Sequence, residues 1–139
     1  MTTAEIHIPE PDPDNWVVLE KTGGIRVNTM WENPDNGATI ALLDIPAGAG
    51  IPVRHEHASN QFMYVLRGHY RYLAPEPGLD LHEGHFYSNP KGHPHGPTTA
   101  VTDCLILEIY DGAHYTETPP YHTAETVGRI ASPVAKTNG

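Results

Sequence analysis

The 139-residue sequence contains one cysteine, few basic residues and no long apolar run. Cys104 lies in the apolar stretch DCLILEIY and has no partner for a disulfide, so we interpret it as a small buried hydrophobic residue. Only eight lysines and arginines oppose 17 acidic residues, which gives a net charge of −9, and the basic residues are scattered along the chain. This charge disfavours binding to nucleic acids and to anionic membranes.

No stretch approaches the roughly 20 consecutive apolar residues of a membrane-spanning helix. The N-terminal sequence MTTAEIHIPEPDPDNW has neither the basic start nor the apolar run of a secretion signal. We therefore expect a cytoplasmic protein that binds no membrane and acts on a small molecule. The length suits one domain and is too short for two.

Proline and glycine are abundant and occur in short clusters such as NPDNG, IPAGAGIP and NPKGHPHGP. The segments between these clusters, ATIALLDI and CLILEIY among them, are short and rich in β-branched and aromatic residues. None of them shows a sustained helical stripe of apolar residues. The pattern predicts a single all-β domain, built as an antiparallel sandwich or a small barrel.

We divide the chain into three regions. Residues 1–14 are expected to form an extended arm, residues 15–112 the β-barrel, and residues 113–139 a polar segment that packs on the barrel and ends in loose residues. At most one short helix is expected in that last segment, around residues 123–130. The arm resembles a segment that completes a neighbour's sheet, so we expect a homodimer.

Histidines gather in two segments. In HEHASNQFMYVLRG, residues 55–68, His55 and His57 are two apart, so on an extended strand they project from the same face. Gln61 follows at the start of an apolar stretch, where its amide oxygen can join the two imidazoles. The segment GHFYSNPKGHPHGP adds His93 and His95, which also share a face, and strand parity alone does not choose between them.

These two segments resemble the two conserved motifs of the cupin superfamily. The first has the His-x-His pair and ends at Gly68, but Gln61 takes the place of an acidic residue. The second matches at Gly84, Pro90, Gly92 and His95, and it has Thr99 where the motif has asparagine. The resemblance implies a jelly-roll β-barrel fold.

Cupins bind one divalent metal ion inside the barrel through these motif positions. The resemblance therefore implies that the metal ligands here are His55, His57, Gln61 and His95, with a hydrogen bond from Gln61 to a bound water as the alternative for that residue. A further alternative is that these are polar barrel residues that bind no metal. We expect Fe²⁺ or Mn²⁺, with Zn²⁺ or Ni²⁺ as chemically suitable substitutes.

The expected ligands are all neutral, so the ion keeps its full charge and acts as a strong Lewis acid toward an anionic oxygen donor. The chain is most similar to single-domain cupins that include diketone-cleaving and dihydroxyacetophenone dioxygenases. This resemblance implies a dioxygenase that cleaves a C–C bond of a small diketone or hydroxyketone chelated to the metal. The alternatives are non-oxidative Lewis-acid chemistry, as in cupin hydroxynitrile lyases with three histidines and one glutamine, and a non-catalytic ligand or metal sensor.

Strand parity and side-chain type suggest further positions. The candidates for the substrate pocket are Met63, Val65, Arg71, Tyr72, Phe86 and Leu107, with Leu105 as a similar case. His85 and His93 are candidates for acid–base roles, and an exposed surface position is the alternative for both. The surface is the expected place for His69, His82, His114 and His122.

Overall fold

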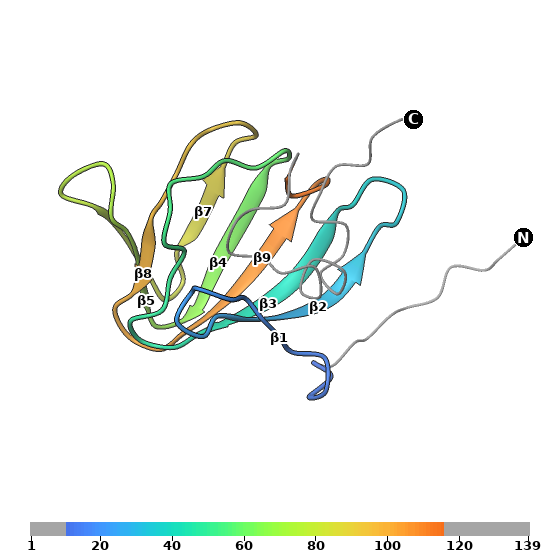
Figure 1. Cartoon of the computed structure of the whole chain (residues 1–139), viewed down its shortest axis with the longest axis horizontal. Coiled ribbons are helices and arrows are strands. Elements are labelled where there is room, and N and C mark those ends of the chain that lie inside the picture. Colours follow the sequence, from blue (N-terminus) through green and yellow to red (C-terminus); the bar gives the residue numbers. More distant parts are fainter. Residues whose placement is uncertain (1–10, 116–139) are drawn as a thin grey trace, which may run out of the picture.

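A computed structural model describes residues 11–115, which fold into two antiparallel β-sheets (Figure 1). The larger sheet contains, in spatial order, β1 (Val17–Val18), β2 (Arg26–Glu32), β3 (Thr39–Ile45), β9 (Cys104–Tyr110), β4 (Gln61–Arg67) and β7 (Phe86–Asn89). The smaller sheet contains β6 (Leu79–His82), β5 (His69–Tyr72) and β8 (Thr98–Ala100).

The all-β prediction is confirmed, and the described residues form no helix. Accordingly, nothing in residues 11–115 provides a helix that could cross a membrane. The expected helix at 123–130, most of the expected arm and all but the first residues of the C-terminal segment lie outside the described residues. The part of the arm that is described contains a turn, in which the Asn15 N–H donates to the Asp12 oxygen at 3.0 Å.

The stretch FMYVLRGHYRYL is divided between the two sheets at Gly68. This glycine has a φ of 91°, and a Cβ there would lie 2.2 Å from the Asp103 backbone oxygen. Only glycine fits such a position, so the chain leaves β4 and enters β5 here. Strands β6 and β8 were not predicted, because LDLH and TTA are short and carry few strand-forming apolar residues.

The inner face of the larger sheet changes from apolar to polar along its strands. In the middle, Leu43, Ile106 and Val65 are neighbours on β3, β9 and β4, and the last two are fully buried. At one end, the cross-strand row consists of Thr39, Tyr110, Gln61 and Asn89, all buried. The apolar rows supply the core, at about 1.5–3 kcal/mol for each large buried side chain, and the polar row faces the candidate site.

Candidate metal centre

His55 and His95 come from loops that pair with each other. Their backbones exchange two hydrogen bonds, His55 N–H to the His95 oxygen at 2.9 Å and His95 N–H to the His55 oxygen at 2.8 Å. The Gly92 N–H also donates to the His57 oxygen at 3.0 Å. The histidines therefore lie outside regular strands, contrary to the sequence prediction, because prolines at 52, 90, 94 and 97 interrupt both segments.

The three imidazoles nevertheless converge. The ring centroids lie 4.9 Å apart for His55 and His57, 4.4 Å for His55 and His95, and 4.6 Å for His57 and His95. One candidate ligand atom from each ring lies within 4.8 Å of the other two. Three imidazoles at this spacing can hold one metal ion of the first transition row.

Backbone carbonyls determine which nitrogen two of these rings offer. Nδ1 of His55 lies 3.0 Å from the Val53 oxygen, and Nδ1 of His95 lies 2.9 Å from the His93 oxygen. A carbonyl can only accept, so each Nδ1 carries the proton and each Nε2 carries the lone pair. The His95 Nε2 is buried and has no hydrogen-bond partner within residues 11–115, which fits a metal ligand.

Burial also keeps these rings in the form that binds metal. Desolvation lowers the pKa of His95 to about 4 and lowers the pKa of His55 from its ordinary value. Both rings are therefore neutral at pH 7, and no proton has to leave before a cation binds.

Gln61 lines the same pocket as the histidines, and both ends of its amide are hydrogen-bonded. Its Nε2 donates to Glu108 Oε2 at 2.6 Å and to the Tyr110 hydroxyl at 3.0 Å, and its Oε1 accepts from Asn89 Nδ2 at 2.7 Å. An amide oxygen has two lone pairs, so one remains for a cation or a water. Ligation by Gln61 stays a prediction.

Glu108 provides a buried carboxyl group next to Gln61, and the sequence analysis did not identify it. Burial raises its pKa to about 7, although the hydrogen bonds from Gln61 and Tyr110 act in the opposite direction. The signal for it was present, because CLILEIY contains one glutamate in an otherwise apolar run. A charged residue at such a place either points to solvent or has a specific buried partner, and here it has two.

A pocket adjoins the histidines. Of the predicted pocket residues, Met63 and Tyr72 line it, whereas Val65 is buried in the core without lining it. The pocket also contains polar residues that were not predicted, namely Tyr70, Thr98, Glu108, Tyr110, His114 and Tyr115. The expectation of a surface position for His114 is wrong, because its ring stacks on Tyr110 at 3.7 Å and its Nε2 lies 2.7 Å from Thr39 Oγ1.

Besides Val65, four residues that were predicted for the pocket do not line it. Leu107 and Leu105 are on the outer face of β9, where Cys104, Ile106, Glu108 and Tyr110 point inward. Phe86 is 63% exposed on the edge strand β7 and stacks with Phe62. Strand β9 carries apolar side chains on both faces and β7 carries one aromatic residue on each, so alternation alone did not fix which face is buried.

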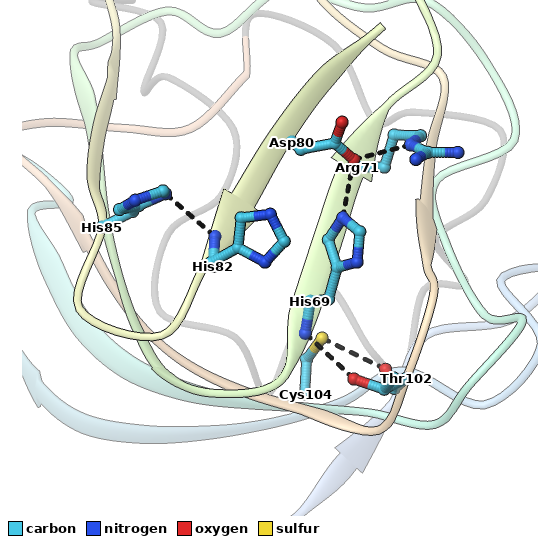
Figure 2. Close-up of polar contacts among 7 residues, drawn as sticks. All are labelled: His69, Arg71, Asp80, His82, His85, Thr102 and Cys104. Atoms are coloured by element: carbon cyan, nitrogen blue, oxygen red, sulfur yellow. Dashed lines mark hydrogen bonds and ion pairs between the residues drawn. The ribbon is translucent and has the colours of Figure 1, made fainter.

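Arg71 is the fourth. It lies on the smaller sheet and donates to Asp80 at 2.7 Å, and Asp80 also contacts the His69 ring (Figure 2). The contacts from Arg71 and His69 lower the pKa of Asp80. Arg71 thus has an acidic partner at the surface and does not need an anionic substrate to offset its charge.

The two acid–base candidates are also outside the pocket. His85 is exposed, and its Nδ1 accepts from the His82 N–H at 3.0 Å (Figure 2). The His93 ring is exposed, and this residue serves the site through its backbone oxygen, which holds His95. Neither ring lines the pocket.

A family model described as a ChrR cupin-like domain matches residues 6–113. The chain belongs to the ChrR cupin-like family. The cupin fold predicted from the two motifs is therefore confirmed. Curated protein sequences contain no match to this ChrR-type cupin.

Solved structures share the fold of this chain. An acetylacetone dioxygenase from Acinetobacter johnsonii has a TM-score of 0.70 at 19% identity, covering 89% of this chain and 85% of its own. A putative acetylacetone dioxygenase from Methylibium petroleiphilum has a TM-score of 0.66 at 19% identity, with 87% and 88% covered. The anti-sigma ChrR of Rhodobacter sphaeroides, in complex with SigE, has a TM-score of 0.56 at 26% identity, with 69% and 49% covered. The likeness to the two dioxygenases shows the fold.

Proposed function

We propose that this ChrR-type cupin is a metal-dependent dioxygenase that cleaves a C–C bond of a small diketone or hydroxyketone chelated to one divalent ion. The observation that carries the proposal is the charge of the site. Burial keeps the pKa of His55 and His95 low, so these two rings are neutral at pH 7, and no lysine or arginine lines the pocket among residues 11–115.

This charge pattern restricts the substrate. A phosphate or a polycarboxylate brings several negative charges, which one divalent ion cannot balance beside the carboxyl group of Glu108. A diketone binds as a singly charged enolate, and a hydroxyketone loses at most one proton. Both offer two oxygens to one metal and leave little charge elsewhere.

The described residues have distinct roles in this proposal. His55, His57 and His95 hold the ion, Fe²⁺ or Mn²⁺, which supplies Lewis acidity and redox capacity when bound. Met63, Leu43 and Ile25 provide an apolar wall that excludes water and accommodates the hydrocarbon part of the substrate. The Tyr72 hydroxyl accepts from Asn89 Nδ2 at 3.1 Å, and burial raises its pKa, so Tyr72 stays a neutral hydrogen-bonding group.

A ligand or metal sensor is the second candidate, supported by the family match and by the likeness to an anti-sigma protein. The same histidines then hold an ion whose ligand is bound and not converted. A non-oxidative lyase is the third candidate and needs the same Lewis acid without dioxygen.

Dioxygen uptake by the Fe²⁺-loaded and the Mn²⁺-loaded protein separates the three candidates. With acetylacetone or a simple hydroxyketone, the dioxygenase consumes one dioxygen per substrate cleaved, and His95→Ala abolishes uptake. Conversion of a carbonyl compound without uptake contradicts the dioxygenase and supports the lyase. Tight binding of the diketone with neither uptake nor product supports the sensor.

A further inference from the structure

Glu108 is the only buried aspartate or glutamate among residues 11–115, in a chain that carries 17 acidic residues. A carboxylate in such a place is costly unless nearby groups compensate it. No lysine or arginine lines the pocket with it in the described part of the chain. Its compensation therefore comes from hydrogen-bond donors and, in the metal-loaded protein, from the cation.

The contacts of Glu108 orient the Gln61 side chain. An ionised carboxylate accepts hydrogen bonds and donates none. The group that donates to Glu108 Oε2 at 2.6 Å is the amide nitrogen of Gln61. Asn89 Nδ2 donates to the amide oxygen at 2.7 Å from the other side. The two neighbours together fix which end of the amide is oxygen.

Tyr110 connects the same carboxylate to a histidine. Its hydroxyl lies 3.0 Å from His57 Nε2, 3.0 Å from Gln61 Nε2 and 3.4 Å from Glu108 Oε2. The hydroxyl accepts a hydrogen bond from Gln61 Nε2 and donates one to Glu108 Oε2. Glu108 therefore contacts the ligand sphere through two side chains, Gln61 and Tyr110.

We propose that Glu108 is a positioning residue of the metal centre, which turns the Gln61 amide so that its oxygen is available to the cation. This inference rests on the metal site of the proposed function. Groups behind the ligands commonly change metal affinity by about 10–100-fold.

The contact also explains why position 61 carries an amide. With glutamate at 61, two carboxylates would meet at the place where Nε2 now lies 2.6 Å from Oε2, and neither would have a proton to share above its pKa. The amide and the carboxylate are therefore expected to be interchangeable only as a pair. Gln61→Glu alone places two carboxylates in contact and creates the repulsion. The double variant Gln61→Glu/Glu108→Gln again has one amide and one carboxylate, with their positions exchanged, and so removes the repulsion.

The test uses Co²⁺ alone as the probe, at about pH 8, where free imidazoles are neutral and able to bind metal. The proteins are the full-length wild type, Glu108→Gln, Gln61→Glu and the exchanged pair, with Glu32→Gln on the exposed end of β2 as the matched control. Two quantities are measured, the Co²⁺ affinity with its visible absorption spectrum and the thermal midpoint of the metal-free protein.

We expect Glu108→Gln to weaken Co²⁺ binding by at least about tenfold and to shift the absorption bands, while Glu32→Gln changes neither. We also expect Gln61→Glu to lower the metal-free midpoint and the exchanged pair to recover most of that loss. If Glu108→Gln keeps the wild-type Co²⁺ affinity and absorption spectrum, the inference about Glu108 is overturned, and the proposed metal centre still stands. If the wild type binds no Co²⁺, the metal centre itself is wrong and this inference falls with it.

Discussion

Gly50 lies so close to Thr98 that no side chain fits between them: a Cβ on Gly50 would lie 1.9 Å from the Thr98 backbone oxygen. Two hydrogen bonds join the adjoining residues, Ile51 N–H to Thr98 Oγ1 at 2.9 Å and Thr98 N–H to the Ile51 oxygen at 3.0 Å. This contact holds the segment before His55 against the strand after His95, and so it helps to bring the two halves of the metal centre together.

Gly50→Ala is therefore expected to destabilise the protein by more than about 3 kcal/mol, because the clash is with backbone and cannot be relieved by a rotamer change. Gly84→Ala is the matched control. Its φ of 83° is strained for alanine, but nothing lies within 4 Å of the added Cβ, so it should cost only about 1–2 kcal/mol. Urea unfolding measures both, and equal losses contradict the close approach at Gly50.

The orientation of β9 predicts a difference between neighbouring residues. Ile106 is fully buried, so Ile106→Ala should cost about 2–5 kcal/mol, through lost burial and the cavity that remains. Leu107 lies on the outer face of the same strand and is partly exposed, so Leu107→Ala should cost clearly less. Chemical denaturation of the two variants provides the comparison. A larger loss of stability for Leu107→Ala would mean that Leu107 faces the interior, as the sequence analysis expected.

Cys104 should react slowly in the native protein. Burial raises the pKa of its thiol above the ordinary value, with a smaller contribution from Asp103, so less thiolate is present at about pH 8 than in an exposed cysteine. Its alkylation by iodoacetamide should be much slower than in the urea-unfolded chain, and the rate should still be rising with pH at about pH 9. Equal native and unfolded rates would place Cys104 at the surface.

Metal binding should stabilise the folded chain, because the three histidines come together only there. At a free Co²⁺ concentration of 100 times the dissociation constant, the gain is about 2.7 kcal/mol. Thermal unfolding with Co²⁺ and after chelation measures this shift, which should vanish in His95→Ala. A shift of the same size in that variant would mean that the ion binds elsewhere.

The sequence predicted the fold and the histidine triad because both rest on local signals. Turn residues divide the strands, and the spacing of His55, His57 and His95 matches known motifs. The orientation of β7 and β9 was not predictable in the same way, because Phe86, Leu105 and Leu107 are apolar residues on outer faces and look like core residues. Alternation has two phases, and only tertiary packing chooses between them.

Glu108 and His114 show the other limit. Each is a polar residue whose buried position depends on partners far away in the sequence, Gln61 for one and Thr39 for the other. The polar row at the end of the larger sheet is formed by strands that are neighbours in space and not in sequence. A reading of single segments therefore found the histidines that converge but not the buried residues behind them.

Metal content tests the central claim most directly. The full-length chain is purified from its own host, and its metal content is measured by inductively coupled plasma mass spectrometry. The same measurement is made on the variant His55→Ala/His57→Ala/His95→Ala. The control is the variant His69→Ala/His82→Ala/His85→Ala, in which the replaced rings lie on or near the surface of the smaller sheet. We predict about one divalent ion per chain in the wild type and the control, and almost none in the first variant. Equal metal content in all three proteins, or none in the wild type, would contradict the account.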